Sequence, residues 1–155
     1  MIFKKHKLIK SATVYISPGY NRIIIAPKHI NQDGIQYEQD ACFVYELNVN
    51  EEKLGTEIIN CLNLYSYKEA QLQFLKRSDW PAFRYSNLKT IKTFQENYIG
   101  IDVSGVNDSN LILRIECPIG KTDLLISSYI SFNTTKVEIG RRVRDVFEGV
   151  HKYDT

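Results

Sequence analysis

The side chains that most often perform chemistry are few in this sequence and widely spaced. It contains three histidines and three cysteines, namely His6, His29, His151, Cys42, Cys61 and Cys117. No two histidines stand four residues apart, and no Cys-x-x-Cys pair occurs, although zinc sites need three or four clustered ligands. We therefore predict no metal site and no bound cofactor. Each cysteine lies in an apolar run and is expected to be a buried thiol.

The tripeptide Gly120-Lys121-Thr122 matches the end of a phosphate-binding loop. That motif also needs a glycine five residues before Gly120, where this chain has Ile115. It needs a following helix whose first turn faces the phosphates, whereas a strand-like run follows here. A tight turn is the better interpretation.

An acid–base pair is conceivable for His29 with Asp33 or Glu38, because histidine titrates near neutral pH. No Gly-x-Ser-x-Gly, His-Glu-x-x-His or Gly-x-Gly-x-x-Gly motif accompanies it. The adjacent Glu51 and Glu52 would point about 100° apart on a helix and could not share a proton. The sequence therefore predicts no catalytic residue and favours a binding protein over an enzyme.

Charge is divided between two segments of the chain. Residues 33–57 contain seven acids and one base, whereas residues 68–92 contain six bases and two acids, in a chain of net charge +2. A solvated surface of mixed charge is the simplest interpretation, but an acidic surface also suits a basic protein partner. The residues predicted to engage such a partner are Asp33, Glu38, Asp40, Glu46, Glu51 and Glu52.

The segment 77–87, RSDWPAFRYSN, contains the one tryptophan of the chain. Its aromatic residues suit a core, a protein interface or a platform that stacks single-stranded nucleic acid. We expect Trp80 and Phe83 to pack in the core, and Arg84 and Tyr85 to be exposed as additional interface candidates. The alternative function is a single-stranded nucleic-acid-binding module that uses Trp80, Arg84, Tyr85 and the bases of residues 68–92.

Hydrophobic periodicity predicts the elements that position these residues. Strands are expected in a hairpin over residues 11–27 and at 41–49, 99–103, 111–117 and 124–132, and helices at 50–66, 86–98 and 134–150. Asn50, Ser86 and Thr135 are the predicted helix caps, with Glu138 completing a capping box. Short turns join the last three strands, which must therefore be antiparallel. The predicted fold is a single α+β domain, residues 1–155, in which an antiparallel sheet of about five to six strands carries two to three helices against one face.

No run approaches the roughly 18 apolar residues of a membrane-spanning helix. The basic start MIFKKHKLIK is not followed by an apolar stretch with a cleavage site. We therefore expect a cytoplasmic protein without a membrane partner.

Four stretches carry a family resemblance: VYISPGYNRIIIAP, DWPAFRYSNLKTIKTFQENYIGIDVSG, NDSNLILRIECP and EIGRRVRDVFEG. From about Thr13 to Gly149 the chain resembles one group of immunity proteins of bacterial contact-dependent growth inhibition systems. Such a protein binds the toxic C-terminal domain of an effector in the cytoplasm and neutralises it. The group is associated with ribonuclease-type toxins, including ones similar in fold to pancreatic ribonuclease.

The resemblance implies a non-enzymatic protein that is monomeric when free and binds one toxin domain 1:1, without nucleic acid. Carboxylates of the 33–57 segment would then occupy the basic site of the nuclease in place of phosphate oxygens. The net charge of +2 is less acidic than expected for a simple charge mimic. Binding should therefore depend on a local acidic surface or on a surface beside the active site of the toxin.

Overall fold

The computed structural model describes residues 9–72, 80–116 and 125–151. The strands within these ranges are β1 (Ser11–Ser17), β2 (Arg22–Ile30), β3 (Gln36–Glu38), β4 (Phe43–Tyr45), β5 (Ser66–Tyr67), β6 (Ile99–Gly105), β7 (Asn110–Glu116) and β8 (Leu125–Ser131). The helices are α1 (Glu51–Asn63), α2 (Pro81–Tyr85), α3 (Ile91–Asn97) and α4 (Lys136–His151). No helix within the described ranges is long and apolar enough to cross a membrane.

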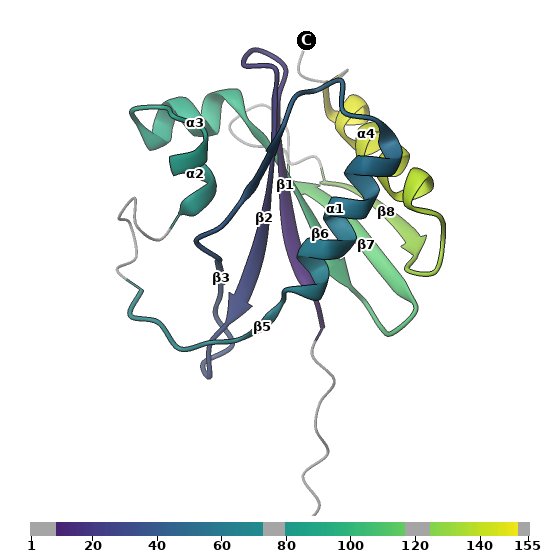
Figure 1. Ribbon diagram of the computed structural model, residues 1–155, viewed down its shortest axis with the longest axis horizontal. Helices are drawn as coiled ribbons and strands as arrows, with labels where there is room; N and C mark the ends of the chain where they lie inside the picture. Colours follow the sequence, from purple (N-terminus) through teal and green to yellow (C-terminus); the bar gives the residue numbers. More distant parts are fainter. Residues whose placement is uncertain (1–8, 73–79, 117–124, 152–155) are drawn as a thin grey trace, which may run out of the picture.

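All eight strands belong to one sheet with the order β3-β2-β1-β6-β7-β8, and β4 and β5 also pair with β2 (Figure 1). Every pairing is antiparallel except the short one between β5 and β2. The first hairpin turns at Pro18 and Gly19, where Asn21 adopts a positive φ of 48° and donates its N–H to the Pro18 carbonyl. The predicted α+β class, the hairpin and the antiparallel meander of β6, β7 and β8 are confirmed.

The main core lies between the sheet and the helices α1 and α4. The apolar stripe predicted for the first helix is buried, as is that of the last: Leu54, Ile58, Cys61, Leu62, Ile139, Val143, Val146, Phe147 and Val150. These side chains pack on alternate residues of the central strands, and each large one contributes roughly 1.5–3 kcal/mol through burial. Asn50 caps α1 by accepting the N–H of Lys53, as predicted.

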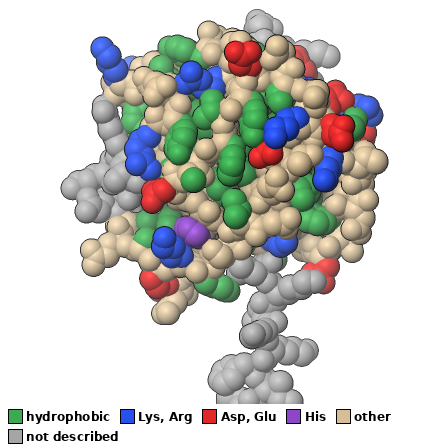
Figure 2. Space-filling model, in the orientation of Figure 1, with side chains coloured by type: hydrophobic (Ala, Val, Ile, Leu, Met, Phe, Trp, Pro, Cys, Tyr) green, Lys and Arg blue, Asp and Glu red, His purple; other side chains and the backbone are tan. Residues whose placement is uncertain are grey.

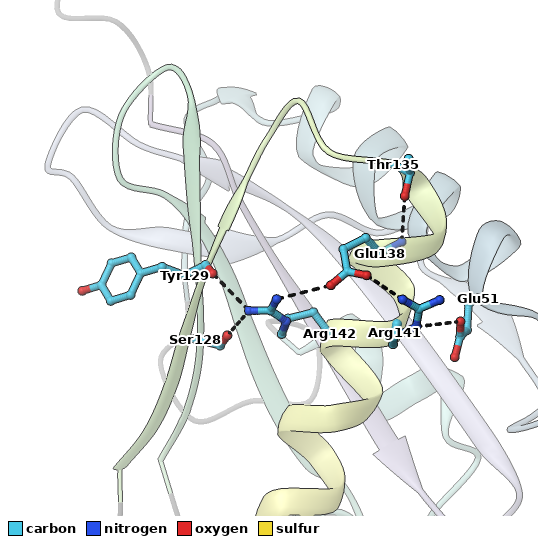
Figure 3. Close-up of polar contacts among 7 residues, drawn as sticks. All are labelled: Glu51, Ser128, Tyr129, Thr135, Glu138, Arg141 and Arg142. Carbon is cyan, nitrogen blue, oxygen red and sulfur yellow. Dashed lines mark hydrogen bonds and ion pairs between the residues drawn. The ribbon is translucent and has the colours of Figure 1, made fainter.

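Polar contacts join the start of α4 to α1 and β8 (Figure 3). Thr135 caps α4 by accepting the Glu138 N–H, while the Glu138 carboxylate accepts hydrogen bonds from Arg141 and Arg142. Arg141 also pairs with Glu51 at 3.6 Å. The predicted capping box is therefore half formed, because the Glu138 side chain turns to the arginines of its own helix.

Helices α2 and α3 pack on the opposite face of β2, so the expectation that helices cover one face was wrong. Ile24 and Ala26 point to this second face, where they join Cys42, Ala82, Phe83, Phe94 and Tyr98 in a second cluster. Their neighbours Ile23 and Ile25 point to the main core. A strand covered on both faces needs consecutive apolar residues, which is the pattern of residues 23–26.

Two predicted elements differ in extent from those observed. Instead of one helix over residues 86–98, α2 ends before Ser86, Asn87 takes a positive φ of 59°, and Thr90 caps α3. The strand predicted at 41–49 is three residues long, so Glu46 lies beyond it.

The thiols of Cys42 and Cys61 are buried as predicted, and burial raises the pKa of each to about 12. Cys117, residues 120–122 and their predicted turn lie outside the described residues.

Candidate functional site

Helix α2 has five residues and is held at both ends by side chains from the sheet. Trp80 is the N-cap residue of α2, but its side chain makes no capping hydrogen bond. The Glu38 carboxylate of β3 instead accepts the Ala82 N–H at 2.9 Å. At the other end, Arg22 Nη1 donates to the carbonyls of Tyr85 and Ser86, each at 3.2 Å. An anion at the first turn and a cation at the last satisfy terminal backbone groups and complement the helix dipole.

The Glu38 carboxylate belongs to a buried hydrogen-bonded chain. Tyr15 donates its hydroxyl hydrogen to Glu38 at 2.5 Å, and Trp80 Nε1 donates to the Tyr15 oxygen at 3.0 Å. Glu38 is 9% exposed, and this burial raises its pKa even though hydrogen bonds from Tyr15 and Ala82 lower it. Glu38 was predicted to lie on a binding surface. It is buried instead, and its carboxylate accepts a backbone N–H from the first turn of α2.

The aromatic residues around α2 form part of the second cluster. The Trp80 ring lies 4.9 Å from that of Phe94 in an edge-on arrangement, and Phe83, 2% exposed, packs on the same ring. The prediction that Trp80 and Phe83 anchor this segment as core is confirmed. A nucleic-acid module would need the Trp80 ring for stacking, but that ring is already packed against protein.

On the outer side of α2 lies an open hollow of about 710 Å³, called here the α2 hollow. It is lined by Arg22, Asp40, Val44, Arg84, Tyr85 and Asn87. Val44 and Tyr85 are 41% and 36% exposed, while Arg84 Nη2 lies 3.2 Å from Asp40 Oδ1. The structure thus brings together one acidic candidate, Asp40, and both additional interface candidates, Arg84 and Tyr85.

Sequence reasoning missed three residues of the hollow: Arg22, Val44 and Asn87. Arg22 and Val44 resemble any other residue of a strand, and their place follows from the pairing of β2 with β4. The position of Asn87 could have been predicted, because asparagine readily adopts the left-handed conformation just after the end of a helix.

The remaining acidic candidates do not form one surface. Asp33 follows the end of β2, whereas Glu46 lies beside its beginning, where Tyr45 pairs with Ile23. The nine residues of β2 separate the two positions by roughly 30 Å. Figure 2 shows acidic side chains interspersed with Lys and Arg on the face in view.

Some of these carboxylates form ion pairs and others do not. Asp40 pairs with Arg84, and Glu51 pairs with Arg141. Asp33, Glu46 and Glu52 are exposed, and no ion pair joins any of them to another residue within the described ranges.

His29 does not form an acid–base pair with Glu38. In the register of β2 and β3, His29 stands opposite Tyr37 and Lys28 opposite Glu38, so His29 and Glu38 point to opposite faces. His29 Nδ1 lies 3.0 Å from the Ser66 hydroxyl, and burial lowers the pKa of the imidazole. Within the described ranges, no group of three His, Cys, Asp or Glu residues could hold a metal ion.

Solved structures of other proteins share this fold. A protein of unknown function from Neisseria meningitidis superposes with a TM-score of 0.70 and 17% identity, over 96% of this chain and 98% of that one. A chain of the CdiA-CT/CdiI toxin and immunity complex from Yersinia pseudotuberculosis superposes with a TM-score of 0.62 and 10% identity, over 92% and 97%. No protein-family model and no curated protein matches the sequence. The chain therefore has the fold of a component of a toxin and immunity complex.

Proposed function

We propose that this protein is a cytoplasmic immunity protein of a bacterial contact-dependent growth inhibition system. It binds the toxic C-terminal domain of one effector 1:1 and neutralises it, and that domain is a nuclease of the ribonuclease type. The observation that carries the proposal is the fold likeness to a chain of a toxin and immunity complex, which extends over 92% of this chain and 97% of that one. The resemblance of the sequence stretches to immunity proteins supports the same role.

The proposed interface combines the α2 hollow with carboxylates near the start of α1. Glu46 is two residues beyond Val44, which lines the hollow, and Glu52 is exposed in the first turn of α1. Arginine and tyrosine are enriched among residues that dominate binding energy, and both line the hollow. The carboxylates would steer a basic nuclease towards this end of the sheet.

The first test is a calorimetric titration of the full chain with the C-terminal domain of the effector encoded beside it. We expect 1:1 binding, and we expect the bound toxin domain to lose its cleavage of RNA. Light scattering of the free chain should give the mass of a monomer. A toxin domain that does not bind, or that cleaves RNA equally well when saturated, would contradict the proposal.

Charge reversal at two matched positions tests the location of the interface. Glu46→Lys should slow association because it repels a basic partner, whereas Asp33→Lys, roughly 30 Å away along β2, should change the rate little. Both side chains are exposed, and the substitutions change the net charge equally. Stopped-flow association at two ionic strengths measures the effect, and a larger effect at Asp33 would move the interface to the opposite end of β2.

A further inference from the structure

The α2 hollow contains two guanidinium groups and one carboxylate. Arg22 is held in place because its Nη1 donates to the Tyr85 and Ser86 carbonyls. Arg84 projects from the last turn of α2 and meets Asp40 through Nη2. The charge of the lining side chains is therefore positive, although Asp40 belongs to the most acidic segment of the chain.

The ion pair in the hollow is weak and easily exchanged. The side chain of Asp40 is 93% exposed and that of Arg84 is 48% exposed, so water competes for both charges. An exposed pair of this kind is worth at most about fivefold in an equilibrium constant. Arg84 could exchange Asp40 for another carboxylate at small cost, and would gain if that carboxylate also reached Arg22.

The apolar part of the hollow favours a protein ligand. Tyr85 and Val44 expose apolar surface beside the arginines, and a tyrosine next to arginine is typical of the residues that anchor protein interfaces. Guanidinium groups recognise a planar carboxylate through paired hydrogen bonds. An acidic side chain flanked by apolar residues would therefore match the hollow in both charge and surface.

We propose that the α2 hollow binds an acidic side chain of the toxin domain, which displaces Asp40 from Arg84 and lies between Arg84 and Arg22. This inference rests on the proposed function and specifies one contact of that interface. Asp40 acts as an internal competitor that occupies Arg84 in the free protein. Its charge therefore opposes binding of the partner, contrary to the role expected for an acidic residue facing a basic nuclease.

The direction in which Asp40→Asn changes the affinity for the toxin domain tests the proposal. Asp40→Asn removes the competitor and should tighten binding of the toxin domain by about two- to fivefold in a calorimetric titration. Arg84→Gln should weaken it at least tenfold, because the incoming carboxylate loses its partner. Glu96→Gln is the matched control, because it removes another exposed carboxylate, the partner of Lys92 on α3, and should leave affinity unchanged.

A double-mutant cycle links the effect to Arg84. In an Arg84→Gln background, Asp40→Asn should no longer tighten binding, because no arginine remains to be released. Weaker binding by Asp40→Asn, or the same gain without Arg84, would overturn the inference while leaving the immunity function intact. A wild-type chain that does not bind the toxin domain would contradict the proposed function, and the inference with it.

A single-stranded RNA oligonucleotide titrated into the free chain completes the test. We expect no binding at physiological salt. Binding that falls steeply with salt and is lost in Arg84→Gln would assign the arginines to phosphate groups and overturn the inference.

Discussion

At the scale of single residues, tertiary structure gives Glu38 a structural role in place of the surface role predicted from its charge. It belongs to an acidic segment, yet its carboxylate accepts hydrogen bonds from Tyr15 and Ala82 beneath α2. Replacing Glu38 by alanine would leave two donors without this acceptor, and each unpaired buried donor costs about 1–3 kcal/mol. Such a loss would also disturb Arg84 and Tyr85, because α2 carries both.

Burial raises the pKa of Glu38, and the pH dependence of stability should report it. Between the unfolded value of about 4.3 and the higher native value, the native state keeps a proton that the unfolded state has lost. The free energy of unfolding should therefore fall as pH rises through this interval. Glu38→Gln should remove this decrease, because an amide does not titrate there.

Urea unfolding at pH 4, 5.5, 7 and 8 would measure the difference between the wild type and Glu38→Gln. As pH rises, the free energy of unfolding of the wild type should fall relative to that of Glu38→Gln. Glu52→Gln, which removes an exposed glutamate of α1, controls for the loss of one carboxylate. A difference that shifts in favour of the wild type would mean that the native state prefers the charged form of Glu38.

At the scale of elements, the contact between α1 and α4 depends on two glycines. A Cβ atom added at Gly55 would lie 1.8 Å from the Lys136 carbonyl oxygen, and one at Gly140 would lie 2.1 Å from that of Glu51. Both obstacles are backbone atoms, which cannot turn aside as a side chain can. The two helices must therefore move apart to accept any larger residue at either position.

Alanine at these positions should destabilise the protein. We expect Gly55→Ala and Gly140→Ala each to cost at least about 1–3 kcal/mol, because relief of the overlap separates the main core. Gly149→Ala is the control, because Gly149 lies in α4 with Gly140 and an added Cβ there would make an ordinary contact of 3.7 Å with Ile126. It should be neutral or should stabilise by up to about 1 kcal/mol through helix propensity.

Denaturant midpoints of the three alanine variants, measured at constant pH, give the comparison. Equal stabilities for Gly140→Ala and Gly149→Ala would mean that α1 and α4 do not approach as closely as described.

At the scale of the whole molecule, one strand joins two apolar clusters. Ile23 and Ile25 of β2 contribute to the main core, and Ile24 and Ala26 contribute to the second cluster. A strand shared in this way cannot leave one cluster while remaining in the other. The two faces of the sheet should therefore unfold together.

The single tryptophan tests this cooperativity, because Trp80 packs against the second cluster alone. Its fluorescence and the far-UV circular dichroism should show the same denaturant midpoint. Trp80→Phe, which lacks the indole, supplies the fluorescence baseline. A fluorescence transition at lower denaturant would show that α2 and α3 open before the main core does.

Much of this fold could be predicted from local patterns. The stripes of α1 and α4, the cap at Asn50 and the alternation in β6 and β7 all appear within a few residues, because helix and strand periods are short. Helix α2 was missed, because five residues are too few to show a helical period. The next helix was predicted to begin at the Ser86 cap, whereas α3 begins after the Thr90 cap. The candidate site was only partly predictable, since Arg84 and Tyr85 could be expected at the surface but Arg22 could not be expected beside them.

Local patterns in the sequence were enough to establish the hairpin of β1 and β2, the helices α1 and α4, the antiparallel meander of β6 to β8, and the packing of Trp80 against the core. Tertiary structure alone decided which charges reach solvent. Glu38 caps a helix whose Ala82 lies 44 residues away, and Arg84 meets Asp40 across the same separation. Backbone periods and caps act over one or two turns of chain, whereas the environment of a carboxylate depends on residues brought near it only by folding.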